Sequence, residues 1–417
     1  MKLDDKRGNQ LTFLVLMVYF SSYLTRINFQ TIISEFVTAE NVKRSSASIV
    51  LTVMAITYGL GQIISGFLGD KISPRHLVFG GMVTAVIMNV LMPLCSPNIK
   101  LMTVIWGING LSQAFMWPPL VKIMSAAMTE KKYIKTMPLF GFSTGGGTVA
   151  MYLLAPLIIH LLNWKCVFLF SAVFGAVASA VWFISTKKVL VNVEIIPQNV
   201  NKNLNSEKPK SKVHIPIILL ITILLSIAIQ GALRDGITTW VPSFISETFN
   251  LNNKASILSS VIMPVFHIIF NFVVYWFLRK MKNKVFETLV ILFGCLSVSL
   301  AGLLVLGVKT LIIALPILAA VSGFVHGINS LQTCCIQNYF KDVGNIAFIT
   351  GLLNCGTYIG SSFSTYLFAV ISEKSGWNMT LVSWIAFSVA GVLLTSLCIR
   401  FYRSLYIKKL DKMKSGI

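Results

Sequence analysis

The chain has 417 residues, of which 55% are hydrophobic and only 12% are charged, and its mean hydropathy is +0.77. A soluble protein has about twice that share of charged residues, so the composition excludes a water-soluble fold and indicates a chain that crosses a membrane many times. The net charge of +21 does not indicate nucleic-acid binding, because the basic residues lie in short loops between apolar stretches.

Twelve apolar stretches each approach the roughly 20 residues that a bilayer core requires. We expect spans at residues 11–36, 47–69, 77–96, 101–127, 137–160, 164–186, 214–246, 255–278, 286–307, 311–338, 345–371 and 378–400. The long polar stretch in the middle predicts an N-terminal six-helix bundle over 1–186, a cytoplasmic linker over 187–213 and a C-terminal six-helix bundle over 214–417. The sequence therefore predicts an all-α membrane protein with twelve transmembrane helices in two pseudo-symmetric bundles.

The basic residues predict the orientation of these spans. Of the 35 Lys and Arg residues, 25 lie in segments on the N-terminal side of the membrane and seven lie on the opposite side. Because basic loops stay in the cytoplasm, we expect a multi-pass protein of the plasma (inner) membrane with both termini cytoplasmic. The other three, Arg26, Lys122 and Arg234, lie within spans, where an ionisable side chain is costly and marks a functional site.

Arg26 and Arg234 occupy equivalent depths in the first and seventh spans. Arg26 lies about 15 residues into its span, or roughly 22 Å along a helix, and Arg234 lies at a similar depth. Two such arginines, one from each bundle, are expected to face a common central cavity. The alternative is that each satisfies helix carbonyls or pairs with Asp235, which is the only acidic residue deep in a span. At about 100° per residue, we expect Asp235 to point away from Arg234 and to contact a neighbouring helix.

A second motif lies at the cytoplasmic turn between the second and third spans. Gly66-Phe67-Leu68-Gly69-Asp70-Lys71-Ile72-Ser73-Pro74-Arg75 combines glycines with opposite charges. Asp70, Lys71 and Arg75 are candidate gating residues, because a charge cluster there would hold the two bundles together in one state. The alternative is an ordinary basic turn. The pattern resembles the signature loop of the major facilitator superfamily.

Further stretches resemble the organophosphate:phosphate antiporters of that superfamily, which include glycerol-3-phosphate and hexose-6-phosphate transporters. They are 23–29 (YLTRINF), Trp117-Pro118-Pro119 with Lys122, Gly145-Gly146-Gly147, and 233–242 (LRDGITTWVP). The resemblance implies that Arg26 and Arg234 bind phosphate, which suits the planar donor fork of a guanidinium. It also implies that the cavity is lined by Tyr19, Tyr23, Tyr58, Tyr358 and His326.

The chain departs from the glycerophosphate carriers at basic positions. Gln62 and Ile27 stand where those carriers have lysines, and Phe142 stands where they have a histidine. We include Gln62 in the expected substrate-binding set with Arg26, Arg234, Tyr23, Tyr58, Tyr358 and His326. The less basic cavity allows a phosphonate or a carboxylate besides a phosphate ester.

These residues predict exchange of an organic anion for inorganic phosphate by alternating access. Two uncompensated cations in an empty site would resist enclosure, so we expect reorientation without cargo to be slow. Two alternatives stay open. One is a proton-coupled carrier of another organic anion or small solute that uses Asp235, and the other is a transporter-like sensor of sugar phosphates.

The sequence lacks the motifs of other functions. It has no nucleotide-binding loop, nucleophile elbow or paired catalytic carboxylates, so we expect no enzyme, no catalytic residue and no cofactor. The seven cysteines lack metal-ligand spacing and the histidines form no ligand cluster, so we expect no metal. The expected partners are the anion, inorganic phosphate and the lipid bilayer, without nucleic acid, and the expected assembly is a monomer.

Overall fold

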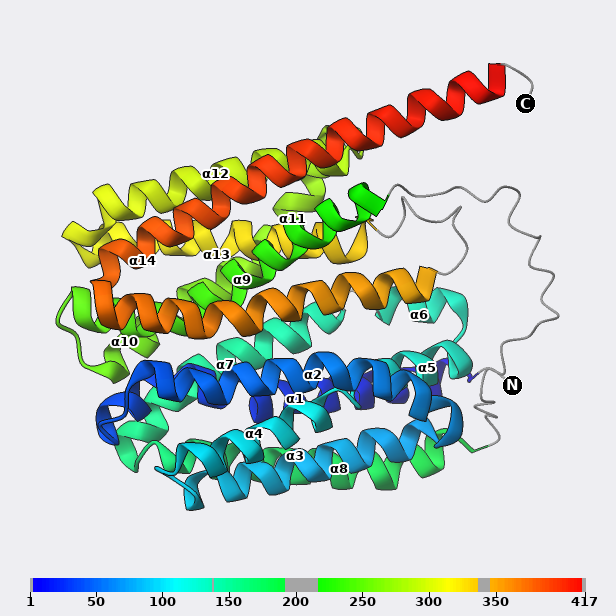
Figure 1. Cartoon of the computed structure of the whole chain (residues 1–417). Coiled ribbons are helices and arrows are strands. Elements are labelled where there is room, and N and C mark those ends of the chain that lie inside the picture. The colour runs from blue at the N-terminus through cyan, green and yellow to red at the C-terminus, as the bar shows by residue number, and fades with distance from the viewer. Residues whose placement is uncertain (1–2, 137–138, 192–216, 337–345, 415–417) are drawn as a thin grey trace. The chain divides into compact units, whose positions relative to one another are not determined.

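The computed structural model describes residues 3–136, 139–191, 217–336 and 346–414 (Figure 1). Within these ranges the secondary structure is helical and contains no strand. The helices are α1 (Asp5–Ala39), α2 (Arg44–Lys71), α3 (Pro74–Leu94), α4 (Ile99–Gln113), α5 (Trp117–Ala127), α6 (Glu130–Thr136), α7 (Phe140–Leu161), α8 (Lys165–Val189), α9 (Ile217–Thr248), α10 (Asn253–Ser259), α11 (Ile262–Lys280), α12 (Val285–Val305), the short η2 (Gly307–Lys309), α13 (Leu311–Cys334) and α14 (Ile346–Lys414).

Most of the expected spans correspond to single helices. Among the described residues, nine helical stretches are long and apolar enough to cross a membrane. The last, Leu352–Tyr402, is 51 residues long and is interrupted at Gly376, whose φ of 76° is not helical. It therefore accounts for the two spans expected at 345–371 and 378–400, which meet at this glycine because positive φ carries little steric cost without a Cβ.

The span expected at 101–127 is not one helix. Helix α4 ends at Gln113, and α5 begins at Trp117 with Pro118 and Pro119 in its first turn. A proline has no amide hydrogen, and its ring collides with the preceding turn, so it is favoured in the first turn of a helix. The diproline therefore divides this span into two helices, which corrects the expectation of a continuous span.

The helices group into two compact units, which we describe separately. The first contains α1 to α8 together with residues 239–265 and 365–370, and the second contains the rest of α9, residues 266–364 and the chain from Ile371. The domain boundaries expected at 186 and 214 stay a prediction.

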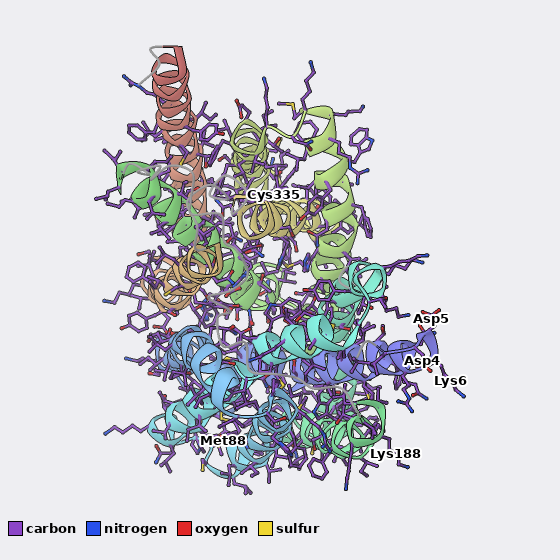
Figure 2. The ribbon with its side chains drawn as sticks, turned by 90° about the vertical axis from the view of Figure 1, so that its right-hand side faces the viewer. Asp4, Asp5, Lys6, Met88, Lys188 and Cys335 are labelled. Carbon is purple, nitrogen blue, oxygen red and sulfur yellow. The ribbon has the colours of Figure 1, made fainter. Side chains whose placement is uncertain are left out.

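In the first unit α1 packs against α7 and α8, α3 packs against α8, and α2 packs against α4 (Figure 1). Helix α1 begins where the Asp4 side chain accepts a hydrogen bond from the Arg7 amide at 3.0 Å. Asp4, Asp5 and Lys6 lie together at this end of α1 (Figure 2). The apolar core between α1, α3 and α8 includes the fully buried side chains of Val18, Val78 and Trp182.

In the second unit α9 and α14 cross at very close range. A methyl group on Gly231 would collide with the backbone of Thr357, and one on Gly360 would collide with the backbone of Ala228. Only glycine fits at such positions, because every other residue carries a Cβ. This crossing brings the residues after Gly231 on α9 next to those around Gly360 on α14.

Candidate functional site

Arg26 lies on α1 against two tyrosine rings. Its Cζ atom is 4.2 Å from the ring centroid of Tyr23 and 5.0 Å from that of Tyr58 on α2. A guanidinium over an aromatic face is attracted by the ring quadrupole, and the attraction is larger where water is excluded. Of the three tyrosines that the resemblance implies for this half of the candidate site, Tyr23 and Tyr58 thus lie beside Arg26. Tyr19 packs against Trp117 and Phe140 in the buried core. Gln62 lies one helical turn beyond Tyr58 on α2 and is partly buried.

A network of buried amides bonds to Thr25, the residue before Arg26 on α1. The side chain of Asn109 donates to the Thr25 carbonyl at 3.1 Å, and that of Gln113 donates to the Thr25 hydroxyl at 2.9 Å. Asn89 donates to the same carbonyl at 2.9 Å and accepts from Asn28 at 2.6 Å. These bonds join α3 and α4 to the turn of α1 that carries Arg26.

This network was not predicted from the sequence. The signal was present, because amide side chains inside apolar spans must find partners where there is no water. Asn89, Asn109 and Gln113 are all such residues and are at most 2% exposed.

The glycine run expected near the site lies on α7, close to α1. A methyl group on Gly147 would lie 2.9 Å from Tyr23 Cβ and 3.2 Å from the Phe20 carbonyl oxygen. Since real Cβ atoms essentially never come that close, glycine at this position lets α7 pack against the α1 turn just before Arg26.

Arg234 on α9 forms a bidentate ion pair with the adjacent Asp235. Nε donates to Oδ1 at 2.6 Å and Nη2 donates to Oδ2 at 2.8 Å. The expectation that Asp235 points away from Arg234 was therefore wrong. The two Cα–Cβ bonds do diverge by about 100°, but the three methylenes of an arginine are long enough to bring its guanidinium back to the neighbouring carboxylate.

The Asp235 carboxylate also contacts a second helix, as the sequence predicted. The hydroxyl of Ser361 on α14 donates to Oδ2. Arg234 Nη1 donates to the Asn329 side-chain oxygen on α13 at 3.3 Å, and its Cζ atom is 5.7 Å from the ring centroid of Tyr358. The expectation of an uncompensated cation is consequently wrong for Arg234, because a carboxylate neutralises it.

His326 lies on α13, stacked on His267 of α11 with ring centroids 3.8 Å apart and ring planes inclined by 16°. A methyl group on Gly323 would collide with the Phe270 ring, so α11 and α13 pack closely at this level. Asn329, which contacts Arg234, lies three residues after His326 on the same face of α13. His267 and Asn329 were not predicted, and their sequence context offers no pattern that singles them out.

The two arginines occupy the same register in their helix pairs. Gly147 contacts the carbonyl of Phe20, and Arg26 lies six residues after Phe20. Gly360 contacts the backbone of Ala228, and Arg234 likewise lies six residues after Ala228. In both cases the contacting glycine lies in the fifth expected span of its half. The register supports the internal repeat inferred from the sequence.

Among the three expected gating residues, Arg75 is the one whose side-chain contacts the structure describes. Its Nε donates to the Thr186 hydroxyl at 2.9 Å and its Nη2 to the Phe183 carbonyl at 2.5 Å, both on α8. The side chains of Asp70 and Lys71 lie outside the described residues, so the charge cluster stays a prediction. The observed contacts of Arg75 join α3 to α8 within the first unit.

The chain matches a known protein family over most of its length. The family model "Major Facilitator Superfamily" matches residues 15–365. The glycerol-3-phosphate transporter of Bacillus subtilis is 24% identical over 251 residues, which cover 55% of this chain and 55% of that protein. The probable hexose phosphate transport protein of Chlamydia trachomatis is 29% identical over 107 residues, covering 26% of this chain and 23% of that protein. The matched region thus spans about half or less of these relatives.

A solved structure shares the fold over nearly the whole chain. A bacterial homologue of the human lysosomal transporter Spinster superimposes with a TM-score of 0.78 at 11% identity, covering 96% of this chain and 99% of that one. At this identity the likeness concerns the fold alone. It confirms the predicted fold class, an all-α membrane protein of two pseudo-symmetric helical bundles.

Proposed function

This chain belongs to the Major Facilitator Superfamily, and on that premise we propose that it exchanges an organophosphate, or a similar organic anion, for inorganic phosphate by alternating access. Its fold and relatives are those of multi-pass membrane transporters and not of enzymes. Arg26 and Arg234 are the proposed anion ligands, and Tyr23, Tyr58, Gln62, His326 and Tyr358 line the proposed site.

One observation carries this proposal. Arg234 already holds an oxyanion, the Asp235 carboxylate, through the two donors that a phosphate would use. Arg26 stands in the same register of the equivalent helix pair, supported by Tyr23 and Tyr58. The names of the two relatives, transporters of glycerol 3-phosphate and of hexose phosphate, favour a phosphate ester as the anion.

The remaining parts of the proposal concern gating and placement. Asp70, Lys71 and Arg75 form the proposed cytoplasmic gate, and the protein is a monomer in the plasma membrane with both termini in the cytoplasm. Reporter fusions at either terminus test the orientation. Activity of an extracytoplasmic reporter at the C-terminus would overturn it.

The direct test is uptake of radiolabelled phosphate by proteoliposomes that contain the purified full-length protein. Vesicles preloaded with phosphate should accumulate label, and vesicles loaded with buffer alone should accumulate little. Glycerol 3-phosphate and hexose 6-phosphates should compete for uptake. Absence of uptake in both kinds of vesicle would overturn phosphate exchange.

Two variants connect this transport to the arginines. Arg26→Lys and Arg234→Lys keep the charge but lose the planar fork, so each should lower exchange about 10- to 100-fold, the effect of losing one hydrogen bond to a charged group. The matched control is Arg7→Lys, an exposed residue on α1. Normal exchange by both site variants, at unchanged protein content, would remove the arginines from the proposed site.

A further inference from the structure

The donors on one edge of the Arg234 guanidinium are occupied by the protein itself. Nε and Nη2 both bind the Asp235 carboxylate, at 2.6 and 2.8 Å. This edge is one on which a guanidinium binds a carboxylate or a phosphate in bidentate geometry. An incoming anion that takes these two donors must therefore displace Asp235.

The carboxylate is held on its other side as well. Ser361 on α14 donates its hydroxyl to Oδ2, the oxygen that also accepts from Nη2. The close crossing of α9 and α14 at Gly231 and Gly360 sets the separation of the two helices next to Asp235 and Ser361. Asp235 therefore keeps a hydrogen-bond partner on α14 when Arg234 binds something else.

Exposure indicates which of the two groups is displaced. The Asp235 side chain is 28% exposed, whereas that of Arg234 is 14% exposed. The carboxylate is thus the member of the pair that reaches water more readily. Displacement leaves it hydrated and bonded to Ser361, while the guanidinium stays in place for the new anion.

In the competition for the Arg234 guanidinium, the Asp235 carboxylate has a strong advantage over an anion in solution. Because Asp235 is attached next to Arg234, its effective concentration at the guanidinium is at least on the order of millimolar. A free monoanionic carboxylate offers the same chemistry without this advantage. A phosphate dianion brings twice the charge and therefore a larger Coulomb attraction to the same guanidinium.

We propose that Asp235 is an internal counter-anion, which the transported anion displaces from Arg234 and which thereby lowers the affinity of the site for every anion that binds this edge of the guanidinium. This inference rests on the proposed function, in which Arg234 binds the transported anion. It assigns to Asp235 a role in setting the affinity of the site without any contact to the bound anion.

The test is equilibrium binding of radiolabelled phosphate at pH 8 to the purified full-length protein in lipid nanodiscs, with acetate as the competing monoanion. Asp235→Asn keeps the shape of the side chain and removes its charge. We expect it to bind phosphate about tenfold more tightly, the effect of about 1.4 kcal/mol of lost competition. Acetate should gain by about the same factor, because it displaces the same carboxylate.

Two further variants accompany it. Ser361→Ala removes the hydrogen bond that the displaced carboxylate keeps, so it should weaken phosphate binding about two- to threefold, in the opposite direction to Asp235→Asn. If Asp235→Asn is not monodisperse, Ser361→Ala decides the matter, and unchanged or tighter binding there overturns the inference. Glu373→Gln removes the same charge from an exposed position on α14 and should leave phosphate binding within about twofold of the original protein.

The outcomes separate this inference from the proposed function. If the original protein binds phosphate and Arg234→Lys abolishes binding, but Asp235→Asn binds equally or more weakly, the inference is overturned and the proposed function stands. If neither the original protein nor any variant binds phosphate, both are overturned. Binding by Asp235→Asn alone supports the inference, because the competitor has then been removed.

Discussion

Gly360 packs directly on the backbone of Ala228, and this contact sets the distance between α9 and α14 at the level of the candidate site. Arg234 and Asp235 follow on α9 within two helical turns, and Ser361 and Tyr358 flank the glycine on α14. The ion pair and its serine anchor therefore depend on a backbone crossing that only glycine permits.

Gly360→Ala should disrupt this crossing. The added methyl group meets backbone atoms that cannot rotate away, so we expect a loss of about 1–3 kcal/mol in unfolding free energy and weaker phosphate binding. Gly294→Ala on α12 is the matched control, because a methyl group there meets nothing within 4 Å. Thermal unfolding in detergent measures the effect on both. Equal stability of the two variants would contradict the close crossing.

The buried pair Asn28 and Asn89 should be energetically coupled. Each Asn→Ala change removes the partner of one polar atom, the Asn89 side-chain oxygen or the Asn28 side-chain nitrogen, in an apolar environment, which costs about 1–3 kcal/mol. Once one partner is gone, removing the second should cost less, so the loss for the double variant should be smaller than the sum of the single losses. Detergent-induced unfolding supplies the free energies for this cycle.

Exposed Ser125→Ala is a suitable reference for that cycle, because its hydroxyl donates to the carbonyl of Lys122 on its own helix. It should change stability by no more than about 0.5 kcal/mol. Additive losses for Asn28 and Asn89 would show that their hydrogen bond contributes little.

Tyr58 should contribute to anion exchange through its ring. Tyr58→Phe keeps the aromatic face over which the Arg26 guanidinium lies, so exchange should stay within about twofold. Tyr58→Leu removes the face and should raise KM about fivefold, the effect of roughly 1 kcal/mol of lost cation–π attraction. Tyr366→Leu, an exposed ring, controls for loss of an aromatic residue. An equal loss in Tyr58→Phe would point to the hydroxyl instead.

Arg75 offers a test between a structural role and a gating role. Its hydrogen bonds to Thr186 and Phe183 join α3 to α8, so Arg75→Gln should lower the unfolding free energy by about 1–3 kcal/mol. Thr186→Val should lower it by a smaller amount in the same direction. Exposed Lys100→Gln serves as the control for charge. Unchanged stability together with altered transport would favour the gate.

Much of the fold could be predicted because it follows from hydropathy. The spans and the depth of Arg26 and Arg234 depend on segment length and helical rise, which are properties of the sequence itself. The break before Trp117 was missed although Pro118 and Pro119 signal it, because the diproline was read as a functional motif and not as a helix start.

The details of the site were harder to predict. The pairing of Arg234 with Asp235 depends on side-chain rotamers, and a direction calculated from Cα–Cβ bonds does not include them. The stacking of His267 on His326 depends on which faces of α11 and α13 meet, which a single sequence does not reveal. The amides around Thr25 were recognisable as buried polar groups, but their common partner was not.

The six-residue interval between the glycine contact and the arginine has a consequence for insertions. One alanine inserted after Leu233 would not change Gly231, Ala228 or the α9–α14 crossing. It would also keep the segment helical and its net charge the same. It would shift Arg234 by about 1.5 Å along α9 and turn it by about 100° around the axis, away from Tyr358 and Ser361. The angular position of the charge around its helix, as well as its depth, is therefore part of what the repeated glycine contacts preserve.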